Sequence, residues 1–419
     1  MVHPMRSLIL LALLAPLCSC WSGGNRLGPG ESPKARVGTV TTCSGTDAPL
    51  LTLADLPSVD ALPDPFQSLD GTRITGADQW ACRRVEIAAQ AAAYELGDNP
   101  GKPASVTGSF DTGKINVTAS DGTKTISFAA AVTLPTAGTA PYPAMIGIGG
   151  ISIDAAGLNA MGVATIVFPN DTVAAQVDGS SRGKGAFYDL YGADHSAGAM
   201  MAWAWGVSRL IDAIEQTPAA QIDASRLGVT GCSRNGKGAL IAGAFEPRIA
   251  LTIPQESGSG GSASWRISDA QVASGTMVQT LSEITGENVW FRKSFSLFGY
   301  AAKQLPFDHH MIEGLVAPRA LLIIENSSQV WLGNVSTYND SVAGHAIWEA
   351  LGIPDKMGVS QIGDHSHCMW NGSQQAEVTA YVQKFLIGGG TASTNVIKTD
   401  GGYAYDQPTW APWGVPTLN

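Results

Sequence analysis

The stretch RLGVTGCSRNGKGA at residues 226–239 constrains the fold of this chain more than any other. An apolar run of strand length leads into a segment that suits a helix, and small residues surround the serine between them. This context is typical of a nucleophile elbow, the sharp strand-to-helix turn that exposes a serine hydroxyl. Asn235 stands where the usual G-x-S-x-G pattern has its second glycine, and Gly236 follows it. The stretch predicts Ser233 as a nucleophile, with a glycine-rich packing turn as the alternative.

Strands alternate with helices along most of the chain. Residues 105–135 alternate polar and β-branched side chains between Asp-Thr-Gly and Asp-Gly turns, which predicts antiparallel strands. Later apolar runs have the length and composition of strands buried on both faces. These runs cover 143–150, 162–169, 226–231, 249–255 and 318–326, and helices are expected over 196–215, from Ser233 onward, and over 375–387. The order predicts an α/β-hydrolase fold, a doubly wound three-layer αβα sandwich with a mainly parallel central sheet.

The N-terminus has the features of a leader. Residues 1–20 combine a short basic start with an apolar stretch too short to span a bilayer comfortably, which predicts a signal peptide and a secreted, extracellular protein. The alternative is a lipoprotein signal with lipid attached at Cys20, which would give a lipid-anchored or periplasmic protein. A Gly/Pro/Ser-rich linker is expected over 21–36, a catalytic domain over 37–390 and an extended tail over 391–419.

The charge of the chain limits its partners. A formal net charge of −10 comes without any block of lysines or arginines. The sequence therefore lacks the basic patch that binding to a nucleic acid or an anionic membrane surface requires. Attachment to a membrane is expected only in the alternative of lipidation at Cys20. A neutral or weakly charged substrate is expected, bound by a monomer.

Removal of the leader leaves an even number of cysteines, which in an oxidising compartment predicts two disulfides. They are Cys43, Cys82, Cys232 and Cys368. None has zinc-ligand spacing. The tandem Asp308 to His310 also lacks the spacing that brings metal ligands together on a helix, so it is interpreted as a hydrogen-bonded structural motif. No metal and no cofactor is expected.

A nucleophilic serine needs a histidine to take its proton and a carboxylate to hold the imidazole. The loop between the last predicted strand and the closing helix contains GDHSHC. This is where the predicted fold carries its base, so His365 and His367 are the candidates.

Five stretches, in order, resemble motifs of the glucuronoyl esterases, carbohydrate esterase family 15. They are GCSRNGKGA at 231–239, PQESGSGG at 254–261, LPFDHH at 305–310, APRALLIIEN at 317–326 and SHC at 366–368. The resemblance spans roughly residues 140–390. It implies hydrolysis of the ester between (4-O-methyl-)glucuronic acid of glucuronoxylan and lignin alcohols.

The resemblance also implies roles for the residues around Ser233. In that family the catalytic histidine directly precedes a cysteine that is bonded to the cysteine beside the nucleophile. This implies His367 as the base, with His365 as the alternative, and a bridge from Cys232 to Cys368. The remaining pair, Cys43 and Cys82, would form the second bridge.

The acid has two candidates. The family often takes it from the PQES segment, which implies Glu256. Other α/β-hydrolases usually carry it after the strand that here ends at Glu325, and a structural carboxylate is the preferred interpretation of that residue.

Further residues match the family's oxyanion and sugar contacts. Arg234 would stabilise the oxyanion through its backbone N–H and its side chain. The contacts with substrate would fall on Lys237, Gln279, Glu287 and Trp331. Without the resemblance, Lys237 and Glu287 would pass for a salt bridge and Trp331 for a core aromatic residue.

Two alternative functions fit parts of the same sequence. Another carbohydrate esterase, such as an acetyl xylan esterase, could use the same triad. A catalytically inactive glucuronoxylan-binding protein could retain the sugar contacts, although the intact Ser233, His367 and Glu256 argue against it.

Overall fold

The computed structural model describes Cys43 and residues 50–418. These belong to one compact unit, Cys43–Asn419. The predicted signal peptide, the predicted linker and Cys20 lie outside the described residues. No described helix is both long enough and apolar enough to cross a membrane.

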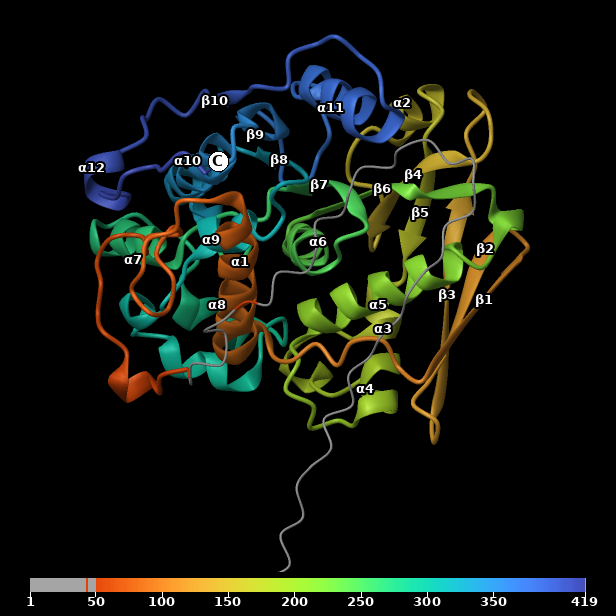
Figure 1. Cartoon of the computed structure of the whole chain (residues 1–419), viewed down its shortest axis with the longest axis horizontal. Coiled ribbons are helices and arrows are strands. Elements are labelled where there is room, and N and C mark those ends of the chain that lie inside the picture. The colour runs from red at the N-terminus through yellow and green to blue at the C-terminus, as the bar shows by residue number, and fades with distance from the viewer. Residues whose placement is uncertain (1–42, 44–49, 419) are drawn as a thin grey trace, which may run out of the picture. The chain divides into compact units, whose positions relative to one another are not determined.

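A ten-stranded sheet runs through this unit in the order β1-β2-β3-β5-β4-β6-β7-β8-β9-β10 (Figure 1). The strands are β1 Ser105–Asp111, β2 Lys114–Ser120, β3 Thr125–Thr133, β4 Tyr142–Ile148, β5 Ala164–Phe168, β6 Ile222–Cys232, β7 Ile249–Gln255, β8 Ala320–Glu325, β9 Met357–Gln361 and β10 Ile397–Thr399. The first three strands form an antiparallel meander, and β3 joins β5 antiparallel. From β5 through β10 the described pairings are parallel.

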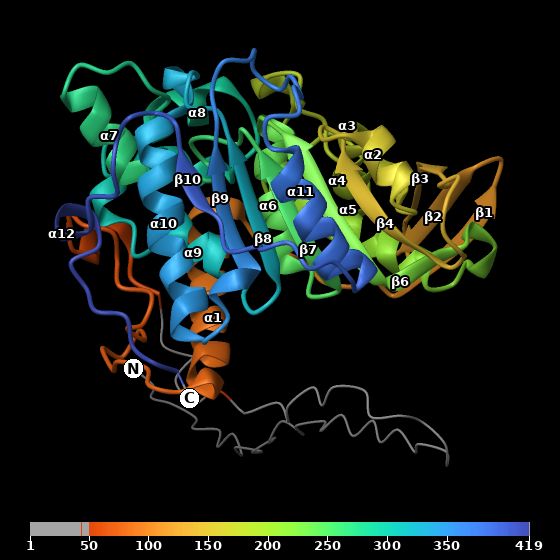
Figure 2. The ribbon, with the colours of Figure 1, turned by 90° about the horizontal axis from the view of Figure 1, so that it is seen from above.

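Helices cover both faces of the sheet. They are α1 Ala77–Ala91, α2 Ala155–Ala160, α3 Asn170–Val173, α4 Ala186–Tyr191, α5 Ala199–Ile214, α6 Arg234–Phe245, α7 Trp265–Ala273, α8 Leu281–Glu287, α9 His309–Gly314, α10 Asn334–Ala350, α11 Gln375–Val382 and α12 Gln407–Trp410. Figures 1 and 2 show α2 and α11 on one face, with α5 and α6 on the other.

Side-chain alternation along the parallel strands creates the two cores. In β8, Leu322 and Ile324 pack with α2 and α11 residues, whereas Leu321 and Ile323 belong to the larger core with α5 and α6. Successive side chains of a strand point to opposite faces, so a strand between two helical layers needs apolar residues at every position. The α/β-hydrolase sandwich is confirmed.

Two strands of the sheet, β9 and β10, fall outside the predicted strands. β10 lies within residues 391–419, where an extended tail was expected, and it pairs in parallel with β9. The C-terminal segment also contacts an N-terminal loop, because Leu62 N–H donates to Trp410 O and Trp413 Nε1 donates to Leu62 O.

Candidate active site

The elbow at the end of β6 holds Ser233 in a left-handed backbone conformation with φ 59°. Residues other than glycine rarely adopt this conformation, and such strain gathers at functional sites. The Ser233 N–H donates to Gln255 O at 2.9 Å, which ties the turn to the neighbouring strand β7. A Cβ at Gly236 would lie 2.6 Å from the same oxygen. The close approach therefore falls at position 236, which explains the departure from G-x-S-x-G.

Asn235 has a positional role of its own. Its Oδ1 accepts hydrogen bonds from Asn170 Nδ2 and Gln176 Nε2, both at 3.3 Å. Its Nδ2 occupies the space where a Cβ at Gly149 would lie, 2.6 Å away. The side chain thus fixes the start of α6 against the loops that follow β4 and β5. A glycine at this position could not make these contacts.

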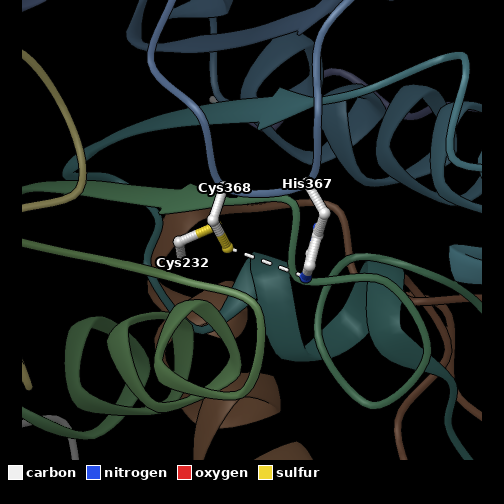
Figure 3. Close-up of side chains that lie close together, drawn as sticks. All are labelled: Cys232, His367 and Cys368. Carbon is white, nitrogen blue, oxygen red and sulfur yellow. Dashed lines mark hydrogen bonds between the residues drawn. A yellow bond between two sulfur atoms is a disulfide. The ribbon is translucent and has the colours of Figure 1, made fainter.

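The base loop is joined to the elbow by a disulfide. Cys232 is bonded to Cys368, with Cα atoms 5.8 Å apart, across a sequence separation of 136 residues. Figure 3 shows the imidazole of His367 beside this bridge, with Nε2 3.6 Å from Cys368 Sγ. The second predicted pair, Cys43 and Cys82, is also bonded. The bridge holds the residues that follow Cys232 and precede Cys368 close together.

Glu256 is the carboxylate that contacts this histidine. It is fully buried at the end of β7, and its Oε2 accepts from His367 Nδ1 at 2.8 Å and from Cys368 N–H at 3.0 Å. A proton on Nδ1 of the neutral ring leaves Nε2 as the free acceptor. The pair therefore has the orientation that a general base requires, and a quarter of the His367 side chain is exposed.

His365 lies in a different environment. Its side chain is 3% exposed, and Nδ1 is 3.7 Å from Glu256 Oε1, beyond hydrogen-bond distance. Its Nε2 faces Ile362 O at 3.1 Å, and its Nδ1 lies 3.1 Å from Asn326 Nδ2. The Nδ1 atom also lies 3.1 Å from Ser366 O, so both ring nitrogens have polar neighbours within the chain. The ring is therefore a buried structural element rather than an accessible base.

Glu325 holds a loop rather than a histidine. Its Oε1 accepts from Ser257 N–H at 2.7 Å, Gly258 N–H at 3.3 Å and Ser262 Oγ at 2.5 Å. Burial raises the pKa of Glu325, and the nearby Glu256 charge adds to the effect. These contacts match the structural interpretation of this carboxylate.

Four of the five predicted oxyanion and substrate residues form a connected group. Gln279 Nε2 donates to Glu287 Oε2 at 3.0 Å, and Arg234 Nη2 lies 4.0 Å from Glu287 Oε1. The Gln279 N–H donates to Trp331 O, and the Trp331 ring meets the His367 ring edge to face at 5.0 Å between centroids. Trp331 is 41% exposed, so its ring is accessible beside the imidazole rather than part of the core.

Comparison with known proteins identifies the family. A family model described as glucuronyl esterase from fungi matches residues 117–352. A 4-O-methyl-glucuronoyl methylesterase of Hypocrea jecorina (strain QM6a) is 50% identical over 358 residues, which cover 85% of this chain and 76% of that protein. The chain belongs to the glucuronoyl esterase family.

Solved structures of the glucuronoyl esterase family share the fold. The catalytic domain of the glucuronoyl esterase from Hypocrea jecorina superimposes with a TM-score of 0.84 at 49% identity, covering 87% of this chain and 98% of that chain. A serine-to-alanine variant of the Sporotrichum thermophile glucuronoyl esterase was solved with methyl 4-O-methyl-β-D-glucopyranuronate. It has a TM-score of 0.83 at 48% identity and covers 87% of this chain and 97% of that chain.

The structure adds Trp290 to the site of this glucuronoyl esterase family member. Its ring lies beneath Arg234 Cζ at 5.1 Å and Lys237 Nζ at 5.9 Å from the centroid. Lys237 is buried and donates to Ser257 O at 2.5 Å. Burial lowers the pKa of Lys237 to about 8. Sequence reasoning missed Trp290, although it follows Glu287 by only three positions.

The Asp-His-His tandem is a buried hydrogen-bonded motif. Asp308 accepts from Trp265 N–H at 2.9 Å and from Arg266 Nη1 at 3.0 Å. His309 and His310 contact backbone carbonyl oxygens through Nδ1 and Nε2, respectively. Among the described residues, one group has ligand atoms close enough for a metal, and it consists of His367 with Cys232 and Cys368. The two cysteines form a disulfide with each other, so neither has a thiolate that could bind a metal ion.

Proposed function

We propose that this chain hydrolyses alkyl or aryl-alkyl esters of (4-O-methyl-)glucuronic acid, the linkage between glucuronoxylan and lignin alcohols. The observation that carries the proposal is the contact between His367 and the buried Glu256, held beside the serine elbow by the bridge from Cys232 to Cys368. Membership of the glucuronoyl esterase family gives the reaction class. The Sporotrichum thermophile structure holds a methyl ester of 4-O-methyl-glucuronic acid, which supports a glucuronoyl group as the acyl part of the substrate.

In this proposal Ser233 Oγ attacks the C6 carbonyl carbon of the uronate while His367 Nε2 takes the hydroxyl proton. The tetrahedral intermediate collapses as the imidazolium gives that proton to the departing alcohol, which leaves an acyl-enzyme. Water then reverses the sequence and releases the uronic acid. Glu256 stabilises the imidazolium in both halves. Arg234 stabilises the oxyanion with its backbone N–H and its guanidinium.

The acyl group would be held by the residues around Trp290. Lys237, Gln279 and Glu287 offer donors and acceptors to the sugar hydroxyls, and Trp331 offers an exposed ring face. Trp290 supports the two cations from below. A saccharide bound there would lie next to the His367 ring that Trp331 contacts.

We also propose that the protein is a secreted monomer with a signal peptide over residues 1–20, a linker over 21–36, a catalytic domain over 37–390 and an appended segment over 391–419. The two disulfides support an oxidising compartment. Size-exclusion chromatography of the purified chain tests the monomer, and N-terminal sequencing of the secreted protein tests the cleavage site.

The deciding experiment compares the turnover of benzyl glucuronate with that of 4-nitrophenyl acetate. Preference for the glucuronate supports the proposal, preference for the acetate favours an acetyl esterase, and tight binding of glucuronoxylan without turnover favours an inactive binding protein. Ser233→Ala should abolish hydrolysis and leave the melting temperature nearly unchanged, because one hydroxyl contributes little to packing. Residual activity above about a tenth would contradict Ser233 as the nucleophile.

A further inference from the structure

A groove rich in positive charge lies beside the candidate active site. Two adjoining cavities of about 190 and 700 Å³ share Arg182, Arg292, Lys293 and Ser296 in their walls. We call this the cationic groove. The larger of the two is within the size range of pockets that bind small ligands.

The three cations of the cationic groove have no carboxylate partner within the described residues. Arg182 Nη1 donates to Phe291 O at 3.1 Å, and Arg292 Nη1 donates to Ala92 O at 3.2 Å. Lys293 is exposed and forms no side-chain hydrogen bond or ion pair with the described part of the chain. Carbonyl oxygens satisfy donors but neutralise no charge. In a chain of formal net charge −10, three adjacent unpaired cations favour an anionic ligand.

The wall of the cationic groove is connected to the candidate active site by hydrogen bonds. Gln176 O accepts from Asn288 Nδ2 at 2.9 Å, and Gln176 Oε1 accepts from Trp290 Nε1 at 2.8 Å. The same amide donates to Asn235 Oδ1 at the elbow. Asn288 lines the smaller cavity and directly follows Glu287 in the chain. The segment 287–293 therefore has predicted substrate contacts at one end and groove cations at the other.

We propose that the cationic groove binds a free uronate carboxylate on the same polysaccharide chain whose esterified uronate occupies the candidate active site. The inference rests on the proposed function, because it requires an acidic polysaccharide as substrate. A guanidinium presents a planar pair of donors that matches a carboxylate, and Lys293 adds a mobile point charge. The groove has one carboxylate in its wall, Asp194, which lies in the larger cavity. A neutral xylan would gain nothing from these cations.

The test uses Lys293→Gln, with Lys184→Gln as the matched control. Lys184 is an exposed lysine close in sequence to Arg182, and it lines neither cavity. For Lys293→Gln we expect kcat/KM on partly esterified glucuronoxylan to fall about 2- to 5-fold at low salt, the range of one exposed ion pair. The loss should disappear in 1 M NaCl, where the Debye length is about 3 Å. Turnover of benzyl glucuronate should be unchanged, because that ester has no second uronate.

Affinity electrophoresis gives a readout that does not depend on catalysis. The wild type should be retarded more by glucuronoxylan than by neutral xylan, and Lys293→Gln should reduce this difference while Lys184→Gln preserves it. Equal effects of the two substitutions, or an equal loss on benzyl glucuronate, would overturn the proposal. If the wild type fails to hydrolyse benzyl glucuronate but still binds the acidic xylan more tightly than neutral xylan, the proposed function is wrong. The binding of free uronate carboxylates by the cationic groove would still be supported.

Discussion

Loss of the bridge between Cys232 and Cys368 should impair catalysis as well as stability. The bridge joins residues 136 positions apart, and the chain-entropy model gives about 5 kcal/mol of stabilisation for such a loop. It also orients the backbone of Cys368, whose N–H donates to the carboxylate that contacts His367. A base displaced by 1 Å can cost on the order of 10²-fold in rate.

The second disulfide provides the matched control. Cys43 and Cys82 are 39 positions apart, for which the same model gives about 4 kcal/mol. This bridge joins Cys43 to Cys82 on α1, whereas the candidate catalytic residues follow β6 and β7 and precede α11. The Cys43→Ala/Cys82→Ala double variant should therefore lose comparable stability and keep its kcat.

The assay measures urea unfolding midpoints and kcat on benzyl glucuronate for both double variants, at a temperature where circular dichroism shows each to be folded. We expect lower unfolding midpoints for both double variants. Only Cys232→Ala/Cys368→Ala should also lose kcat, by about ten-fold to 10²-fold, because a base displaced by 1 Å costs up to about 10²-fold in rate. Full kcat in that variant, or equal losses of kcat in the two, would refute the argument that the bridge positions the base.

Three further outcomes are expected. Glu256→Gln should lower kcat by about 10²-fold or more and Glu325→Gln by less, since only Glu256 contacts the imidazole; the reverse order would move the acid to Glu325. Burial and the charge of Asp340 raise the pKa of Glu313. Above the ordinary pKa of a glutamate, the unfolded chain loses the Glu313 proton while the folded protein keeps it, so the free energy of unfolding falls as pH rises. Glu313→Gln should therefore raise the melting temperature at pH 7 and raise it much less at pH 4. The control Glu283→Gln, at an exposed position, should leave the melting temperature unchanged at both pH values. An equal gain for Glu313→Gln at pH 7 and pH 4 would contradict the argument from titration. Raising the pH through about 8 should increase KM for benzyl glucuronate as Lys237 loses its charge, and a flat KM up to pH 9 would remove that charge from substrate binding.

The sheet was predictable where its strands are apolar on both faces. β4 and β8 are runs of this kind, β7 is mostly apolar, and the predicted ranges match all three within a few residues. β9 was not predictable in this way, because its sequence MGVSQ ends in two polar residues. The Gln361 side chain is buried and hydrogen-bonded: its Nε2 donates to Asn334 O, and its Oε1 accepts from Thr399 Oγ1, so polar partners replace the apolar signal there.

The candidate site was predictable to different depths. The elbow follows from local pattern alone, whereas the choice between Glu256 and Glu325 depends on which carboxylate lies near the imidazole. Glu256 directly follows one buried strand and Glu325 ends the next, so spacing cannot separate them. Trp290 escaped notice because a tryptophan in an apolar context is usually a core residue. The structure shows that it is buried and also supports two cations.

The contact between the two terminal segments makes the chain a candidate for circular permutation. Leu62 pairs with Trp410 and Trp413, and Leu418 N–H donates to Ala350 O on the end of α10. Deletion of the residues after 405 would remove Trp410 and Trp413. The backbone of Leu62 would then lose both hydrogen bonds, although the deletion lies at the other end of the sequence. A linker between residues 418 and 50 would preserve the contacts. New termini could then be opened in the exposed turn between β2 and β3, where Lys124 faces solvent on the opposite flank of the sheet from β10.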